Sequence, residues 1–287
     1  MNCKFCQSPR TMKYGFKAGT QYYKCKDCNR KFAGTLAPAG MRFTTATIGE
    51  AMGLFYDGLS LADISRHLVA TEGINVDPAT VWRWIIRYSK KAERILSQIK
   101  VKTSWRWVID EMMVKVAGQN VWLWDVIEAR SRFLLATHLT ITRNMRSAVA
   151  VLAEANNRTI GTPNYIVSDG MRAYPDAIER VFGADSEHIR SKGLTAEINT
   201  NIIERFQGTV KERTKVMRGL KTMESAKIIS EGFIVHYNFL RPHMTLKGKT
   251  PATVAGLKLP FKTWIELVEY LSKNGKSQLG IFIKLIR

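Results

Sequence analysis

Long apolar segments are missing from this chain of 287 residues, of which 45% are apolar and 24% charged. No run approaches the roughly 18 to 20 consecutive apolar residues that span a bilayer. The N-terminus, MNCKFCQSPR, also lacks the apolar stretch of a signal peptide. The composition still supports a sizeable core, and the length favours more than one domain. We therefore expect a globular cytoplasmic protein without a membrane partner.

Acidic residues are scarce, because 24 Asp and Glu face 44 Lys and Arg, which gives a net charge of +20. The excess lies at the two ends: residues 1–104 and 201–287 each carry a net charge of +10, and residues 105–200 carry none. This balance predicts a polyanionic partner, with nucleic acid as the first candidate. An acidic membrane surface is the alternative, but no basic amphipathic anchor stands out. The partition favours an enzyme whose basic ends hold DNA around a carboxylate site.

Cysteine is absent after residue 28, and the four that exist form Cys3-x-x-Cys6 and Cys25-x-x-Cys28 with 18 residues between the pairs. This spacing is typical of a tetrahedral zinc ion held on two knuckles. Two disulfides are the alternative, which the cytoplasmic character of the chain disfavours. We predict a zinc ribbon over residues 1–34 that could hardly fold without its metal. Its basic residues make DNA its expected ligand: Lys4, Lys13, Lys17, Lys24, Lys26, Arg30 and Lys31.

A helical block over residues 45–98 follows a small, turn-prone linker at 33–40. The first helix stops at Gly58, Ser60 and Asp63 begin the second, and Asp77 with Pro78 begins the third. Three helices with a basic, aromatic third one predict a helix-turn-helix, although the link VATEGINV is longer than usual. The alternative is a plain helical bundle with Trp82 and Trp84 in its core. In the helix-turn-helix reading, three side chains face the DNA groove: Thr80, Arg83 and Arg87.

From Trp105 the pattern changes to strands. Three β-rich runs, WRWVIDEMMVKVAG, NVWLWDVIEA and RFLLATHLTI, are joined by short turns. A helix, the short strand NYIVSDG, a second helix, a further strand or loop and a long helix from about residue 201 are expected to follow. This order predicts an α/β domain with a mixed sheet flanked by helices.

Two carboxylates end apolar runs in this region: Asp110 ends WVID, and Asp169 follows YIVS. A buried strand that ends in an acid carries a desolvation cost unless the acid is paired or binds a metal. Two such acids 4 Å apart would repel by about 4 kcal/mol at an effective dielectric near 20. A divalent cation removes this penalty, and hard oxygen ligands suit Mg²⁺ or Mn²⁺.

Glu204 supplies a third carboxylate, from the start of the long helix and with 34 residues between it and Asp169. Lys211 follows it by seven positions, nearly two turns, so both point the same way, and Gly208 leaves room for a backbone to approach. Other cations of this helix are expected to hold DNA as well: Arg213, Lys215 and Arg218.

Other acids of this region are alternatives to the three carboxylates. They are Glu111, which should face away from Asp110, and Asp125, a possible ligand from the neighbouring strand. Asp176 and Glu179 look like exposed helix acids, and three unrelated surface acids remain the alternative to the triad.

These residues lie in stretches that resemble the DDE transposases of bacterial and archaeal insertion sequences, most closely insertion sequence family six. The matching stretches cover roughly residues 45–235: VDPATVWRWI, WVIDEMMVKVAG, LWDVIEARSRFLLATHLTITRN, IVSDGMRAYPDAI and NIIERFQGTVKERTKVMRGLK. HYNFLRPHMTLKGKTPA resembles a tail common to several transposase families. The zinc ribbon is a departure, since many members begin directly with the helix-turn-helix.

The resemblance implies an RNase H-like catalytic domain over residues 104–250, in which Asp110, Asp169 and Glu204 bind two Mg²⁺ ions. It implies a transposase that binds the terminal inverted repeats of its element, frees 3′ ends and joins them to target DNA, usually by replicative cointegrate formation. Lys211 matches a basic position that contacts element DNA, and synapsis of two ends implies a dimer or larger assembly. A catalytically idle DNA-binding regulator and a structure-selective nuclease are the alternatives. Residues 251–287, with TWIELVEYLSKN as a possible amphipathic helix, have no assigned role.

Overall fold

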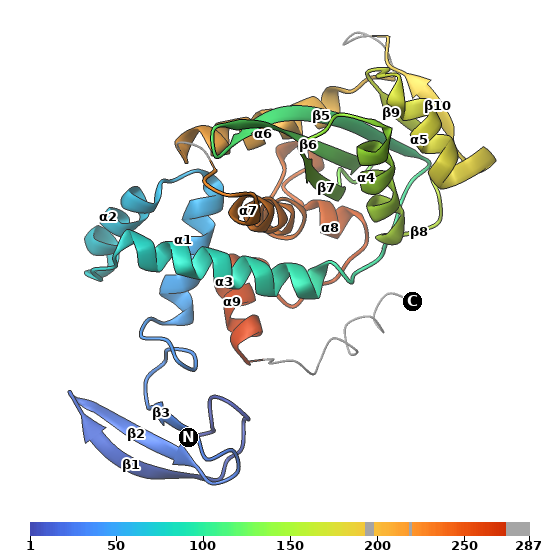
Figure 1. Ribbon diagram of the computed structural model, residues 1–287. Coiled ribbons are helices and arrows are strands. Elements are labelled where there is room, and N and C mark those ends of the chain that lie inside the picture. Colours follow the sequence, from blue (N-terminus) through green and yellow to red (C-terminus); the bar gives the residue numbers. More distant parts are fainter. Residues whose placement is uncertain (193–197, 218–219, 274–287) are drawn as a thin grey trace.

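The computed structural model describes residues 1–192, 198–217 and 220–273. A small β-sheet at the N-terminus lies apart from the rest of the molecule, next to a group of helices (Figure 1). A larger sheet flanked by helices follows at the other end. Within the described ranges, no helix has both the length and the apolar character needed to cross a bilayer.

The N-terminal module is a three-stranded antiparallel sheet of β1 (Thr11–Lys17), β2 (Thr20–Cys25) and β3 (Lys31–Ala33). Its core is minimal: Cys3, Cys25 and Phe32 are the buried residues, and Phe32 stacks on Tyr23 with ring centroids 5.8 Å apart. So little apolar burial cannot order about 34 residues by itself, which agrees with the expectation that a metal stabilises the module.

The next three helices are α1 (Thr45–Asp57), α2 (Leu61–Glu72) and α3 (Pro78–Leu96). The expected caps are present, because Ser60 Oγ accepts from the backbone N–H of Asp63 at 3.2 Å and Asp77 Oδ1 accepts from that of Ala79 at 2.8 Å. The link between α2 and α3 is shorter than expected, since α2 continues to Glu72 and leaves only residues 73–77 between the helices.

The C-terminal helix α9 (Trp264–Lys273) confirms the expected amphipathic helix and packs on α1 and α3. Trp264 stacks on Tyr56 of α1 with ring centroids 5.2 Å apart, and Tyr88 of α3 lies within 3.3 Å of the Ser272 hydroxyl. The two helix axes approach closely because Gly49 of α1 has no side chain at the contact with Ile265. The C-terminal segment is thus part of the helical region that contains α1 to α3.

The main sheet has five strands: β5 (Arg106–Val116), β6 (Gln119–Glu128), β7 (Leu134–Thr140), β9 (Tyr165–Ser168) and β10 (Glu187–Arg190). Their spatial order is β10-β9-β5-β6-β7, with β5, β6 and β7 antiparallel and with β9 and β10 parallel to β5. A separate parallel pair joins β4 (Val101–Lys102) to β8 (Thr159–Ile160). This mixed sheet flanked by helices confirms the predicted RNase H-like α/β class.

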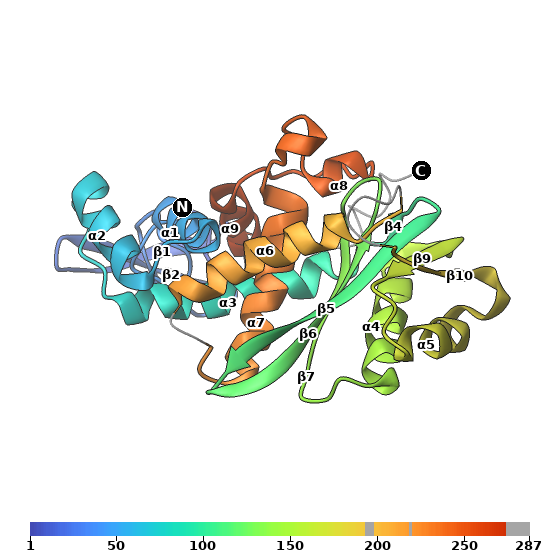
Figure 2. The same cartoon turned by 90° about the horizontal axis from the view of Figure 1, so that it is seen from above.

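Helices cover both faces of the sheet (Figure 2). On one face α4 (Met145–Asn157) contacts β6 and β7, with α5 (Ala173–Phe182) beside it. On the other, α6 (Asn201–Val216) contacts β5 and β6, while α7 (Met223–Val235) contacts β7. The sequence did not predict α7, which continues into the π-helical segment η2 (His236–Leu240). The remaining short elements are η1 (Gly183–Asp185), η3 (Met244–Leu246) and α8 (Pro251–Val254).

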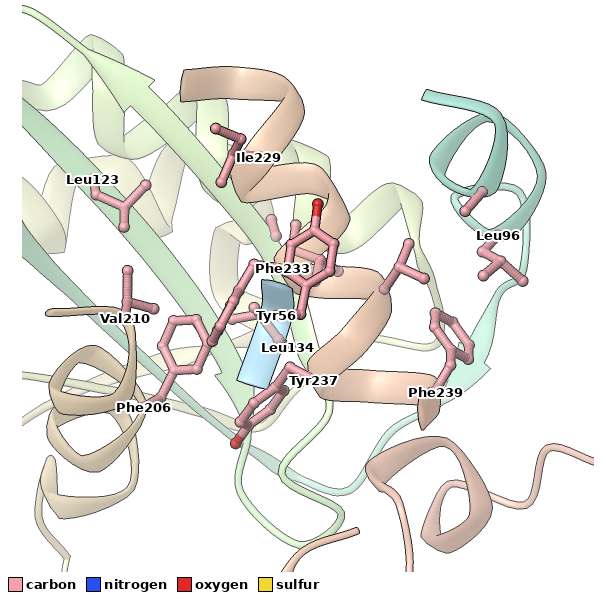
Figure 3. Close-up of a cluster of buried hydrophobic side chains, with 14 of the residues drawn as sticks. Tyr56, Leu96, Leu123, Leu134, Phe206, Val210, Ile229, Phe233, Tyr237 and Phe239 are labelled. Atoms are coloured by element: carbon pink, nitrogen blue, oxygen red, sulfur yellow. The ribbon is translucent and has the colours of Figure 1, made fainter. Parts of the chain in front are cut away.

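The core between α6, α7 and the sheet fixes the position of α6 (Figure 3). Phe206 of α6 packs edge-on against Tyr237, with ring centroids 4.9 Å apart, and is tilted against Phe233 at 5.9 Å. Asn238 of η2 ties this layer to β7, since its side-chain amide donates to the carbonyl of Leu134 and accepts from its N–H, both at 2.8 Å. One face of α6 is therefore anchored, and its other residues stay at the surface.

Candidate active site of carboxylates

Asp110 and Asp169 lie on neighbouring strands at the same level of the sheet. β5 and β9 pair in parallel with Val108 opposite Val167, and this register, continued by two residues, brings Asp110 beside Asp169. Asp169 directly follows β9, as the sequence indicated. Asp110 does not end its strand as expected, because β5 continues to Val116, and its side chain is half-buried in the sheet.

The turn after β9 holds Asp169 in place. The exposed carboxylate accepts a hydrogen bond from the backbone N–H of Met171 at 3.0 Å. Gly170 between them has a φ of 93°, and a Cβ there would meet the Arg190 side chain at 2.3 Å. A residue without a side chain is required for this turn.

Glu204 stands in the first turn of α6 and is exposed. The hydroxyl of Thr200, the residue before the helix, donates to Glu204 Oε1 at 2.7 Å. Two carboxylates of the site are therefore oriented by nearby donors, and the third is held by its strand.

The electrostatics of Asp110 indicate that Asp169 and Glu204 are near enough for their charges to act on it. Burial and, less strongly, the neighbouring Glu111 carboxylate raise the pKa of Asp110 to about 7. The charges of Asp169 and Glu204 act in the same direction. Carboxylate oxygens are hard ligands of the kind that Mg²⁺ or Mn²⁺ prefers. The type of donor therefore fits the expected metal, but the three carboxylates do not gather into a ligand group as close as that of the four cysteines.

Glu111 points to the opposite face of the sheet, as predicted from strand alternation. Its buried carboxylate accepts from Arg143 Nε at 2.6 Å and from the hydroxyl of Tyr174 on α5. The sequence reasoning missed Arg143, which lies just before α4 and also stacks over Trp122 at 4.8 Å. No local motif marks it, because its partner is 32 residues away.

Asp125 lies directly opposite Asp110 on β6 and so shares its face of the sheet. It is fully buried, and the Thr137 hydroxyl donates to its Oδ1 at 2.8 Å. Burial and, less strongly, the Asp110 charge raise the pKa of Asp125 to about 8. A buried carboxyl group that is neutral and already accepts from Thr137 is poorly suited to bind a metal ion. We therefore assign Asp125 a structural role beneath the site. The other rivals, Asp176 and Glu179, are exposed on α5 as expected.

The cations expected to hold DNA along α6 separate into two groups. Lys211 and Lys215 are exposed. Arg213 is only 4% exposed, and its guanidinium carbon lies 3.8 Å from the ring centroid of Phe55 on α1. The prediction that Arg213 contacts DNA is therefore wrong for this conformation, because the helix turns it into the interface with α1. Arg218 lies outside the described residues.

On α3, the predicted groove-facing residues share one side. Arg83 and Arg87 are exposed, and Arg83 Nη1 donates to Thr80 Oγ1 at 3.4 Å. Trp84 is buried and Trp82 is partly buried, so the helix has an apolar side and a basic side. Contact of this basic side with DNA remains a prediction.

The four cysteines form the one group in the described part of the chain whose ligand atoms suit a metal ion, all within 4.8 Å of one another. The thiols are free, and the distances Cys3 Sγ to Cys28 Sγ and Cys6 Sγ to Cys25 Sγ are both 3.6 Å. Sulfurs at 2.3 Å from a tetrahedral zinc ion would be about 3.8 Å apart. The backbone N–H groups of Cys28 and, less strongly, Asp27 lower the pKa of Cys25 to about 7. The donor set fits Zn²⁺ rather than two disulfides.

Comparison with known proteins gives matches over most of this chain. Residues 104–243 match the family model of a DDE domain. The chain is 26% identical over 215 residues to the transposase for insertion sequence element IS257 in transposon Tn4003 of Staphylococcus aureus, covering 73% of this chain and 92% of the relative. It is also 26% identical over 192 residues to an uncharacterized protein of Methanocaldococcus jannaschii, covering 66% and 83%.

Retroviral integrases are among the solved structures that match this chain. The catalytic core domain of the HTLV-2 integrase is 15% identical, with a TM-score of 0.41, and the match covers 55% of this chain and 99% of that one. A chain of the simian T-cell lymphotropic virus intasome is 11% identical with a TM-score of 0.43, covering 75% and 77%.

Proposed function

The chain belongs to the DDE transposases of insertion sequences, and from this premise we propose that it binds the terminal inverted repeats of its own element and joins their 3′ ends to target DNA. The observation that supports the proposal is the register of β5 and β9, which brings Asp110 beside Asp169, together with the effect of the Glu204 charge on Asp110. The net charge of +20 supports a DNA substrate. We further propose replicative cointegrate formation in the cytoplasm of a prokaryotic cell, at the nucleoid.

We propose Asp110, Asp169 and Glu204 as the ligands of two Mg²⁺ or Mn²⁺ ions. Such ions, when bound, activate a water or a 3′-hydroxyl for in-line attack and stabilise the leaving oxygen. The residues themselves supply fixed oxygen ligands, since Met171 orients Asp169 and Thr200 orients Glu204. A site oriented before substrate binding loses less entropy when the phosphodiester arrives.

DNA binding is proposed to involve three surfaces. The zinc ribbon holds one Zn²⁺ between Cys3, Cys6, Cys25 and Cys28 and carries most of the N-terminal positive charge. Thr80, Arg83 and Arg87 are the proposed groove contacts of α3. Lys211 and Lys215 hold the strand that leads away from the carboxylates. Synapsis of two ends requires a homodimer or a larger assembly.

One assay tests the proposal: purified full chain, a labelled element end, a target plasmid and Mg²⁺. We expect a strand-transfer product that is lost in Asp169→Asn while end binding is retained. The matched control is Asp176→Asn, which removes an exposed acid from α5 and should join normally. Binding without chemistry in the unmodified protein would indicate an idle regulator, and cleavage of branched DNA without joining would indicate a nuclease.

A further inference from the structure

A small basic pocket lies on the flank of α6 that faces away from the carboxylates. It has a volume of about 210 Å³ and lies between α6, the turn that joins β6 to β7, and the loop after η2. Ile202, Phe206 and Thr209 of α6 contribute to it. At 3.6 residues per turn, Ile202 is rotated by about 200° from Glu204, so the pocket and the carboxylates lie on different sides of the helix.

The first wall of the pocket presents Arg132 in an uncommon backbone conformation. Arg132 has a φ of 60°, in the left-handed region that non-glycine residues seldom adopt. The turn is held by the buried carboxylate of Glu128, which accepts from the backbone N–H groups of Arg130 at 2.9 Å and Ser131 at 2.6 Å. A left-handed residue other than glycine costs of order 1 kcal/mol or more, and the surrounding hydrogen bonds maintain it.

The second wall is the loop that follows η2 and carries Arg241 and His243. The N–H of Arg241 donates to the carbonyl of His236 at 2.8 Å, and the His243 ring packs edge-on against Tyr237 with centroids 4.5 Å apart. Tyr237 is buried beneath both walls. Burial raises its pKa to about 12, against the opposing charges of Arg132 and Arg241, so both guanidinium groups act on this site.

The lining of the pocket contains no acid that would neutralise its positive charge, and Asp57, whose pKa the Arg241 charge helps to lower, is not part of the lining. The lining does include Arg132, Arg205 and Arg241. Across residues 1–192, 198–217 and 220–273, none of the three forms an ion pair, whereas other arginines of the chain pair with acids, as Arg143 does with Glu111. Arginines that line one pocket without a carboxylate are suited to a phosphate, whose oxygens accept several charge-assisted hydrogen bonds.

The size of the pocket limits the ligand to a single group. Pockets for whole organic molecules measure roughly 300 to 1,000 Å³, and 210 Å³ is below that range. It holds about seven waters at about 30 Å³ each, enough for a phosphate and part of its hydration shell.

We propose that Arg132, Arg241 and Arg205 form a site for a backbone phosphate of the DNA substrate. This inference rests on the proposed function and extends it, because none of the three residues belongs to the carboxylate site or to the predicted contacts of α3. A phosphate bound here anchors DNA across α6 from the point of chemistry. The DNA would then contact both flanks of the helix that carries Glu204.

The test is the salt dependence of DNA affinity for the full chain, measured by fluorescence anisotropy on an element-end duplex and on an unrelated duplex. Arg132→Asn removes the charge with a residue that tolerates the left-handed region. Arg241→Gln removes the other guanidinium without changing that turn. The control Arg180→Gln removes an exposed arginine from α5, on the opposite face of the sheet. Circular dichroism melting checks that each variant is folded.

One lost phosphate contact lowers the slope of log affinity against log salt by about 0.9 on duplex DNA. We expect this decrease in Arg132→Asn and in Arg241→Gln on at least one duplex, and no decrease in Arg180→Gln. Because both arginines bind the same phosphate, the slope should decrease no more in the double variant than in either single variant. The proposal would be overturned if the single variants had the same slope as the control. It would also be overturned if the slope decreased twice as much in the double variant as in a single variant.

A calorimetric titration with inorganic phosphate separates the two sources of this anion. Phosphate binding that both variants abolish, together with unchanged DNA slopes, would assign the pocket to free phosphate and refute the DNA site. If the unmodified protein joins DNA ends but the variants have the same salt slopes as the control, the proposed function stands and the phosphate site is refuted. If the unmodified protein binds neither duplex, both the proposed function and the phosphate site are refuted.

Discussion

Gly49 provides a sharp test of how the C-terminal helix packs on the helix-turn-helix region. A Cβ added at Gly49 would lie 2.3 Å from Ile265 Cα and 2.6 Å from its backbone N. Backbone atoms cannot rotate away as a side chain can, so Gly49→Ala must push α1 and α9 apart. Gly53, one turn later on α1, has only Trp264 Cδ1 nearby, at 3.8 Å, which is ordinary contact.

The two substitutions should therefore change stability in opposite directions. Alanine in a helix interior is favoured over glycine by about 1 kcal/mol. Overpacking costs typically 1 to 3 kcal/mol, and a clash with backbone belongs at the upper end. We expect Gly49→Ala to lower the free energy of unfolding by about 2 kcal/mol and Gly53→Ala to raise it by up to about 1 kcal/mol. At about 2 to 4 °C per kcal/mol for chains of this size, Gly49→Ala should lower Tm by about 4 to 8 °C.

Scanning calorimetry on the full chain measures both variants at the same scan rate. A lower Tm for Gly49→Ala with an equal or higher Tm for Gly53→Ala would support the packing of α9 on α1. If Gly49→Ala is as stable as Gly53→Ala, the close contact with Ile265 does not exist in solution. The role of the C-terminal helix would then have to be reconsidered.

Three further predictions concern other parts of the molecule. Cys25→Ser should release zinc and weaken DNA binding, measured by metal analysis and anisotropy, and an unchanged zinc content would contradict the four-cysteine site. Asn238→Ala should lower the free energy of unfolding by about 3 kcal/mol, because it leaves the N–H and carbonyl of Leu134 without their partner. Urea denaturation measures this change, and an unchanged free energy of unfolding would contradict the prediction. Lys211→Ala should reduce end binding or joining with the fold intact, and normal activity would remove it from the proposed DNA contacts.

Local patterns in the sequence were enough to predict most elements. The caps at Ser60 and Asp77 form as expected because they depend on residues two or three positions away. The same is true of the strand alternation that turns Glu111 away from Asp110. The mixed sheet flanked by helices followed from the order of these elements and from the family resemblance.

Features set by distant contacts were not predictable in this way. Arg213 looks like a surface cation in its own helix, but Phe55, 158 positions earlier, covers it. The helix α7 was missed, and it continues directly into η2. The pocket beside α6 combines Arg132 with Arg241, which no spacing rule brings together.

The most direct test of the carboxylate site compares Mg²⁺-dependent joining in Asp110→Asn, Asp169→Asn and Glu204→Gln with the control Asp176→Asn. Because three ligands of one metal site act as a unit, each single change should abolish joining, and combining two should cause no further loss. End binding and Tm should stay close to those of the unmodified protein. If Glu204→Gln still joins DNA at the normal rate while the aspartate variants do not, Glu204 is not the third ligand and the proposed site is wrong.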